Sequence, residues 1–235
     1  MKKKSKRMKQ LESLVVQDFY SVDEALPLLK QLGTAKFKES VEAHICLNID
    51  PKYANQQLRT SLVLPNGTGK QIRIAVFTDP EYVKEAFEMG ATVAGAENLL
   101  EDIGAGKLDF DILMTTPQLM PKLAKFGRIL GPKGLMPSPK SGTVVTNLRE
   151  AIKEFQKGKV EYRADKTGIV HVQFGKIEFT ENQLKENLLT VYQSIEKNKP
   201  TGVKGRYFQS FNICTTMSPG IRIELGSLKK TLLSF

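Results

Sequence analysis

The spacing of apolar residues changes twice along this chain of 235 residues, and each change indicates a different kind of β-sheet. Between residues 41 and 49 apolar and polar side chains alternate, which is the period of a strand with one buried face and one face in water. Between residues 72 and 78 almost every side chain is apolar, as in a strand buried on both faces. From Val160 the alternation returns. The chain is therefore expected to build two sheets of different character.

The outer parts of the chain carry helix signals beside the alternating strands. Ser21 with Glu24, and Thr180 with Gln183, have the spacing of capping boxes and predict helices over residues 21–32 and from 180 to about 198. The strands predicted in these parts lie at residues 41–49, 58–64, 160–163, 169–174, 176–179, 207–216 and 221–225. The N-terminal part alone has too few elements for an independent core, so the C-terminal part is expected to complete it.

The middle of the chain alternates buried strands with helices. Asp79-Pro80 supplies an N-cap followed by a proline at the first helical position. Strands are predicted at residues 72–78, 92–94 and 111–114, and helices at residues 79–90 and 96–103, from Thr116-Pro117 onward, and from Asn147 to about residue 157. This βαβα order predicts a parallel sheet covered by helices.

The two patterns together predict an α+β split domain interrupted by an inserted α/β domain, Rossmann-like with a parallel sheet. The split domain is expected to comprise residues 1–67 and 160–235, and the inserted domain residues 68–159. The chain would cross between them at Gly67-Thr68-Gly69 and at Gly158-Lys159. Two linkers side by side form a hinge, so rotation of one domain against the other is expected.

One segment of the inserted domain, residues 127–145, is rich in glycine and proline and is here called the signature segment. Its prolines fix φ and lack a backbone donor, so we expect no helix or central strand to run through it. Four apolar residues would anchor it to a core: Ile129, Leu130, Leu135 and Met136. No carboxylate occurs between Arg128 and Arg149, which indicates a surface for phosphate groups. Its candidate residues are Arg128, Gly131, Lys133, Gly134 and Lys140.

A nucleotide cradle is the alternative interpretation of the same segment. Residues 134–141 fit the Walker A spacing except that Pro139 stands where the second glycine is needed. Such a cradle aims consecutive backbone N–H groups at phosphate, and proline has none to aim. A nucleotide-using enzyme on the inserted domain therefore remains the competing hypothesis, with this position against it.

The charge of the chain indicates a polyanionic partner. The net charge is +10, and six basic residues fall within the first ten positions, where a solvated tail that only aids solubility is the plain alternative. We expect this tail to be mobile. No apolar run has the length of a membrane span, no signal or transit peptide is evident, and no basic amphipathic helix with aromatic anchors is seen, so a membrane partner is not expected.

Catalytic and metal-binding patterns are absent from the sequence. Cys46 and Cys214 have no CxxC partner, which favours free thiols in a reducing compartment. The two histidines, His44 and His171, lie in predicted strands and suggest no metal cluster. No GxSxG or HExxH motif occurs, and Gly104-Ala105-Gly106 follows a helix where a dinucleotide site would open one. We therefore expect no cofactor, no metal and no enzymatic activity.

The signature segment resembles that of the ribosomal protein L-one family, which builds the mobile stalk beside the ribosomal exit site. Four further segments resemble the family in the same order and at similar spacing: TAKFKESVEAH (34–44), DPKYANQQLR (50–59), LPNGTGK (64–70) and TTMSPGIRI (215–223). The family's fold, a split two-layer domain with an inserted Rossmann-like domain, agrees with the patterns above. The second of these segments looks most similar to cyanobacterial and plastid members.

The resemblance also implies RNA-binding residues in the split domain. Lys36, Phe37 and Ser40 match family positions that contact RNA, although a phenylalanine at a helix-to-strand corner is more often a core residue. Thr216 and Met217 match a family turn that packs against ribosomal RNA, while Ser218 stands where the family usually has glycine. Ser210 matches a further contact, and Lys166-Thr167 is a candidate that a plain hairpin turn explains equally well.

The function implied by the resemblance is structural. The chain is expected to bind large-subunit ribosomal RNA in the mobile stalk, to help release deacylated transfer RNA from the exit site, and to repress its own messenger RNA. The ribosome would lie in a plastid stroma or, alternatively, in a bacterial cytoplasm.

Overall fold

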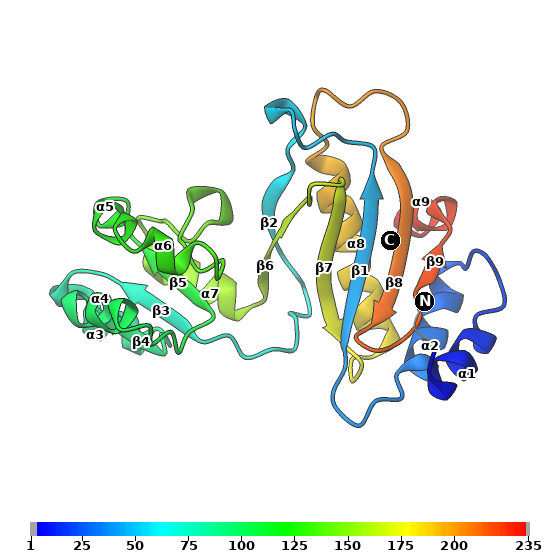
Figure 1. The fold of residues 1–235 in the computed structure, drawn as a ribbon, viewed down its shortest axis with the longest axis horizontal. Helices are drawn as coiled ribbons and strands as arrows, with labels where there is room; N and C mark the ends of the chain where they lie inside the picture. The colour runs from blue at the N-terminus through cyan, green and yellow to red at the C-terminus, as the bar shows by residue number, and fades with distance from the viewer. Residues whose placement is uncertain (1–3, 234–235) are drawn as a thin grey trace. The chain divides into compact units, whose positions relative to one another are not determined.

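The computed structural model describes residues 4–233, and it divides into two compact units. One, here called the split unit, combines the residues up to Gly69 with those from Tyr162 onward (Figure 1). The other, the inserted unit, is Lys70–Glu161. The chain therefore crosses between the units twice.

The split unit is built on a four-stranded antiparallel sheet. Its order is β7-β1-β8-β9, so β1 is flanked by two strands from the C-terminal part of the chain. The strands are β1 (Ser40–Leu47), β7 (Ile169–Lys176), β8 (Phe208–Thr215) and β9 (Ile221–Ile223). Helices α2 (Val22–Leu32) and α8 (Glu181–Lys197) pack on one face, and Figure 1 shows the sheet in front of α8. The other face is called the open face below.

The alternation predicted for β1 places its side chains on the two faces of this sheet. Val41 and Ile45 are fully buried under the helices, whereas Glu42 and His44 are only half-buried on the open face. Both predicted capping boxes are present, Ser21 with Glu24 and Thr180 with Gln183. The strand predicted at residues 176–179 is absent as a separate element, because β7 continues through Gly175 to Lys176 opposite a bulge between Val41 and Glu42.

Two helices of the split unit were not predicted. Helix α1 (Lys6–Leu14) begins with Ser5, whose side chain accepts a hydrogen bond from the N–H of Met8, and Leu11 is buried. The expectation of a mobile tail is therefore wrong from residue 6 onward, because tertiary contacts hold this basic segment as a helix. Lys2 and Lys3 lie outside the described residues. Helix α9 (Leu225–Leu233) follows β9.

Two strands near the unit boundaries pair with each other. Strand β2 (Arg59–Val63) pairs with β6 (Lys159–Arg163) in a separate two-stranded sheet. A short 3-10 turn, η1 (Ala54–Gln56), precedes β2.

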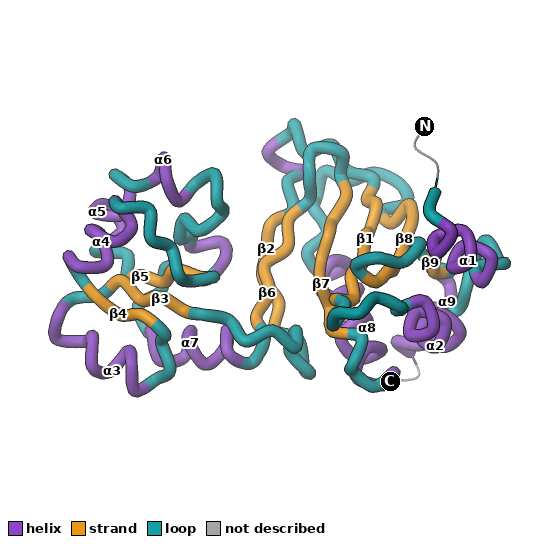
Figure 2. The backbone as a smooth tube through the Cα atoms, turned by 60° about the horizontal axis from the view of Figure 1, so that its bottom comes forward, coloured by secondary structure: helices purple, strands orange, loops and turns teal. Residues whose placement is uncertain are grey.

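The inserted unit has the predicted parallel sheet with helices on both faces, and the predicted fold class is confirmed (Figure 2). The strand order is β4-β3-β5, with β3 (Ile74–Phe77), β4 (Val93–Gly95) and β5 (Ile112–Thr115). Helices α4 (Glu97–Gly104), α5 (Met120–Ala124) and α6 (Gly127–Leu130) contribute to the core on one face. The turn η2 (Pro80–Tyr82) leads into α3 (Val83–Glu88), which packs with α7 (Leu148–Gln156) on the other face.

The signature segment is more ordered than predicted. It contains the four-residue helix α6 and a 3-10 turn, η3 (Pro139–Ser141), but as predicted no helix or named strand runs through the whole of it. Prolines permit this because Pro132 follows α6 and Pro139 occupies the first position of its turn, where no N–H is needed. The helix predicted from Thr116-Pro117 begins later, at Met120.

Candidate nucleic-acid interface

The predicted residues Ser40 and Thr216 meet at one end of the sheet. The Ser40 N–H donates to the Thr216 hydroxyl at 3.0 Å, and the Thr216 N–H donates to the Ser40 carbonyl at 3.1 Å. The Ser40 hydroxyl accepts a hydrogen bond from Lys176 Nζ at 2.9 Å. Three strands thus bring two hydroxyls and one ammonium group to a single place, here called the Thr216 end.

A buried carboxylate lies beneath this end. Glu39 is 1% exposed, and it accepts hydrogen bonds from the Thr215 hydroxyl at 2.7 Å, the Ala35 N–H at 2.9 Å and the Met217 N–H at 2.9 Å. Burial alone would raise the pKa of Glu39, but these bonds and the nearby Arg7 charge together lower it. The ionised Glu39 therefore ties the loop before β1 to the turn after β8.

The loop before β1 presents its side chains to solvent. Phe37 is 53% exposed, so the core-phenylalanine alternative is contradicted. Lys36 is also exposed, and Lys38 forms an ion pair with Glu178 at 2.9 Å. An exposed ring between two lysines offers a stacking surface beside phosphate contacts.

The turn after β8 carries the other predicted residues of the Thr216 end. Met217 is 49% exposed, and its carbonyl accepts a hydrogen bond from Arg7 of α1 at 2.8 Å. The Ser218 hydroxyl accepts from the Thr215 N–H at 2.9 Å and donates to the Pro219 carbonyl at 3.0 Å. Ser218 thus stabilises the turn through its own side chain.

Ser210, Lys166 and Thr167 lie at the opposite end of the sheet. Ser210 pairs with Cys46, and the Gly168 carbonyl accepts a hydrogen bond from the Leu47 N–H. Cys46, the partner of Ser210, lies six residues from Ser40 along β1, which corresponds to about 20 Å. The structure therefore divides the predicted residues into two groups. Within the turn, the Thr167 hydroxyl bonds to Asp165, and hydrogen bonds, from the Ile169 N–H above all, lower the pKa of that carboxyl.

The open face between these ends brings together polar residues whose proximity the sequence analysis did not predict. His44 Nδ1 lies 2.8 Å from His171 Nδ1, and His44 Nε2 lies 3.2 Å from Cys214 Sγ. Burial lowers the pKa of His44, and the positive charge of His171 lowers it further. Burial raises the pKa of Cys214 to about 11. The alternation of apolar and polar residues predicted a solvent-facing side for these strands. It does not reveal which strands pair, because the partners are far apart in sequence.

The signature segment behaves in part as predicted. Leu130, Leu135 and Met136 pack on the core of the inserted unit, whereas Ile129, the fourth predicted anchor, is half-buried and is not part of this core cluster. Ser141 and Thr143 are buried and share a hydrogen bond of 2.9 Å that fixes the end of the segment. The candidate residues are exposed: Arg128, Gly131, Lys133, Gly134 and Lys140.

A cavity of about 590 Å³ lies at the carboxyl ends of β3 and β5, where parallel folds of this type bind ligands. None of the signature-segment candidates is among its lining residues. The cavity contains the carboxylates of Asp79 and Glu85, and Arg149 lies 3.6 Å from Glu85. The cavity thus holds two carboxylates and one arginine that is already paired with one of them. This excess of negative charge disfavours the binding of a nucleotide phosphate there.

Among residues 4–233, no group of three or more His, Cys, Asp or Glu side chains is arranged to hold a metal ion. No helix within the same residues has both the length and the apolar character that crossing a bilayer requires.

Comparison with known proteins gives one consistent result. The model of the Ribosomal protein L1p/L10e family matches residues 28–219. "Large ribosomal subunit protein uL1c" of Rhodomonas salina is 56% identical over 234 residues, which cover 100% of both chains. The uL1c protein of Phaeodactylum tricornutum is 57% identical over 96% of this chain and 98% of its own. "Large ribosomal subunit protein uL1" of Prochlorococcus marinus is 55% identical over 97% of both chains.

Proposed function

The chain belongs to the ribosomal protein L1p/L10e family, and on this premise we propose that its split unit binds large-subunit ribosomal RNA at the Thr216 end of the sheet. The observation that carries the proposal is the buried Glu39, which holds two exposed loops together. One loop offers the Phe37 ring and Lys36, and the other offers Thr216 and Met217. Hydroxyls, an aromatic ring and a preformed surface suit folded RNA, whose 2′-hydroxyls and unstacked bases are read in this way.

The proposal extends to the role of the bound chain. Members of this family are structural components of the large ribosomal subunit and not enzymes. The protein would hold the mobile stalk at the exit site and aid the release of deacylated transfer RNA. The same surface would bind a mimic of the ribosomal site on its own messenger RNA and repress translation.

The inserted unit would supply the moving part. The proposed domains are residues 1–67 with 160–235 for RNA binding and residues 68–159 for the insertion, joined by a two-stranded hinge. Support comes from the two crossings between compact units. The exposed cations of the signature segment, Arg128, Lys133 and Lys140, would contact phosphates of the transfer RNA.

The cellular site follows from the relatives. The uL1c proteins come from algae, and the uL1 relatives come from cyanobacteria. We propose a ribosome in a plastid stroma or, as the alternative, in a bacterial cytoplasm.

The experiment that tests the proposal is footprinting of the full chain on large-subunit ribosomal RNA. The segment that the chain protects is then transcribed and used in titrations with Phe37→Ala. We expect this variant to lose about 1–3 kcal/mol of binding free energy, because one stacking contact is removed. Its melting temperature should stay the same, since Phe37 is exposed. The matched control is Phe87→Ala, which removes a ring of similar exposure, 49%, from the inserted unit. Absence of any protected segment would refute the proposal.

A further inference from the structure

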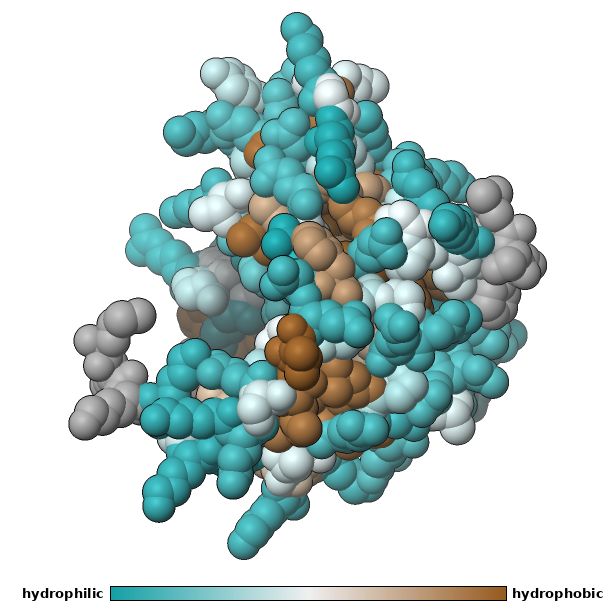
Figure 3. Space-filling model, turned by 90° about the vertical axis from the view of Figure 1, so that its right-hand side faces the viewer, coloured by the Kyte–Doolittle hydropathy of each residue, from teal (hydrophilic) through white to brown (hydrophobic). Residues whose placement is uncertain are grey.

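The edge of the sheet at β9 carries an arginine stacked on an exposed aromatic ring. The guanidinium of Arg222 lies 4.8 Å from the centre of the Phe19 ring. Arg222 is exposed and pairs with Asn212 of β8 in the register, which places it on the open face. Phe19 is 51% exposed although it is large and apolar. Figure 3, which views the right-hand side of Figure 1, shows hydrophobic side chains at several places among hydrophilic ones on this side of the molecule.

The backbone fixes Phe19 in this position. The next residue, Tyr20, makes two backbone hydrogen bonds to the edge of the sheet. Its N–H donates to the Arg222 carbonyl at 3.0 Å, and its carbonyl accepts a hydrogen bond from the Glu224 N–H at 2.9 Å. Tyr20 is buried, and its hydroxyl accepts a hydrogen bond from the Gln17 N–H at 2.9 Å. Neighbouring residues of an extended segment point in opposite directions, so burial of Tyr20 exposes Phe19. The stacked pair is thus built on an anchored segment.

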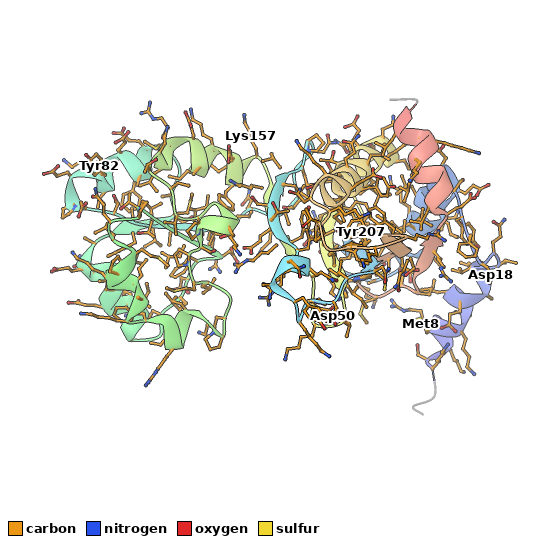
Figure 4. All side chains as sticks on the ribbon, turned by 90° about the horizontal axis from the view of Figure 1, so that it is seen from above. Met8, Asp18, Asp50, Tyr82, Lys157 and Tyr207 are labelled. Atoms are coloured by element: carbon orange, nitrogen blue, oxygen red, sulfur yellow. The ribbon has the colours of Figure 1, made fainter. Side chains whose placement is uncertain are left out.

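A groove of about 250 Å³ runs beside this pair, lined among others by Phe19, Arg222, Arg206 and Ser210. Neither arginine has a carboxylate within ion-pair distance among residues 4–233. One carboxylate, Glu224, also lines the groove, so two cations face one anion. Asp18, the neighbour of Phe19, is labelled in Figure 4 at the outer edge of the unit and is not among the lining residues.

The charge and geometry of the groove favour a phosphate group of RNA as its ligand. An arginine stacked on a ring keeps its planar fork of donors in one orientation, and this fork matches the oxygens of a phosphate. The groove shares Ser210 with the residues predicted to contact RNA, and it lies about 20 Å from the Thr216 end of the same open face. One RNA molecule on this face can therefore reach both places.

We propose that the groove of Phe19, Arg206, Ser210 and Arg222 is a second RNA contact, in which the two arginines bind backbone phosphate. Phe19 acts as a positioning residue that holds the Arg222 guanidinium toward the RNA. This inference rests on the proposed function, because it assumes that the open face binds ribosomal RNA. It adds residues at the β9 edge that are remote from the Thr216 end.

The test is titration of the full chain with the protected fragment of large-subunit ribosomal RNA at several salt concentrations. We expect Arg222→Gln and Arg206→Gln each to lower affinity about tenfold, the loss of one charge-assisted bond. The slope of log affinity against log salt should fall by about 0.7–0.9 for each lost phosphate contact. Arg222→Lys and Phe19→Ala should lie between the wild type and Arg222→Gln, since the charge remains but the oriented fork is lost.

The matched control is Arg163→Gln, which removes one exposed arginine from β6 of the other sheet. An equal loss in this control would show general attraction and overturn the inference. Unchanged affinity in Arg206→Gln and Arg222→Gln would also overturn it, while the proposed function would stand if Phe37→Ala still weakens binding. Melting curves of every variant separate lost contacts from misfolding, and Arg206, in the loop before β8, offers a site where folding is least at risk.

Discussion

Glu39 and Thr215 are 176 positions apart in the chain, yet the Thr215 hydroxyl donates a hydrogen bond of 2.7 Å to the Glu39 carboxylate. Both residues are 1% exposed. The same carboxylate accepts hydrogen bonds from the N–H groups of Ala35 and Met217, so it is the shared acceptor of two loops that carry the exposed residues of the candidate interface. A neutral side chain of the same shape cannot replace it without weakening all three bonds.

We therefore expect Glu39→Gln to lower the free energy of unfolding by about 1–3 kcal/mol, because buried donors lose a charged acceptor. RNA affinity should fall as well, since the loops are less well positioned. The folded-state pKa of Glu39 lies below 4.5, so its stabilisation is present above pH 4.5 and is lost as pH falls through the folded pKa. Denaturant unfolding measured from pH 3 to 7 should show that acid lowers the free energy of unfolding less in Glu39→Gln than in the wild type. The control Glu88→Gln changes an exposed carboxylate and should matter little; equal behaviour of the two variants would contradict the role of Glu39.

A second prediction separates a positioned charge from a general one in α1. Arg7→Gln and Lys9→Gln each remove one positive charge, but only Arg7 bonds to the Met217 carbonyl. Both variants should reduce the salt dependence of RNA binding. Only Arg7→Gln should also lose about 0.5–1.5 kcal/mol of affinity at physiological salt, because the turn loses a bond. Isothermal titration at two salt concentrations measures both effects, and identical losses would show that Arg7 acts only through its charge.

A third prediction concerns Ser218, where the resemblance expects glycine. Ser218→Ala and Ser218→Gly both remove the acceptor of the buried Thr215 N–H, so both should cost about 1 kcal/mol of stability. Only glycine removes the Cβ atom. If RNA approaches the backbone closely here, Ser218→Gly should bind more tightly than Ser218→Ala. Equal affinities, measured by filter binding, would place the RNA farther from this turn.

A fourth prediction assigns RNA binding to the split unit. The four-stranded sheet, α2 and α8 all lie outside residues 70–161. A chain with Gly69 joined to Tyr162 through a short Gly/Ser linker should keep most of the affinity for the protected RNA. Circular dichroism checks that it folds. Tight binding by the isolated segment 70–161, with none by the joined chain, would reverse the assignment.

A fifth prediction tests the start of the inserted unit. Asp111 accepts bonds from the Arg73 N–H at 3.1 Å, Arg73 Nε at 3.3 Å and Lys70 Nζ at 3.0 Å. The Arg73 N–H first, and then Lys70, lower the pKa of Asp111 from 3.8 to about 2. Its stabilisation is present above pH 3.8 and is lost as pH falls toward 2. Asp111→Asn should destabilise the inserted unit by on the order of 1 kcal/mol, discounted for partial exposure. Hydrogen exchange of β3 measures this, with Asp102→Asn as the exposed control that should leave protection unchanged.

The elements that were predictable from sequence depend on short-range chemistry. The capping boxes of α2 and α8 join residues three positions apart, so their signal is complete within one turn. The buried run of β3 and the alternation of β1 report the environment of each strand directly. Helix α1 was missed because three of its first four residues, Lys6, Arg7 and Lys9, are basic, and its apolar residues make only a short amphipathic pattern. Its order depends on Leu11 and on the bond from Arg7 to a residue 210 positions away.

The site was predictable only in part, for the same reason. Phe37 and Thr216 were predicted through resemblance; both are exposed, and their contact with RNA stays a prediction. Glu39 gave no signal, since a glutamate before a strand is usually solvated, and its burial exists only after β8 has paired with β1. Arg222 and Phe19 come together through the pairing of Tyr20 with the β9 edge, which no local pattern reveals.

The central place of β1 has a consequence for the order in which the chain folds during synthesis. Both of its partner strands, β7 and β8, are translated after the whole inserted unit. At typical elongation rates the inserted unit takes on the order of 5–20 s to appear, and β1 has two unpaired edges throughout that time. The inserted unit is continuous in sequence and can complete its core first, whereas the N-terminal residues must be kept from pairing with other nascent chains. Newly made protein thus completes the proposed RNA-binding surface last, only once its C-terminal strands have left the ribosome that makes it.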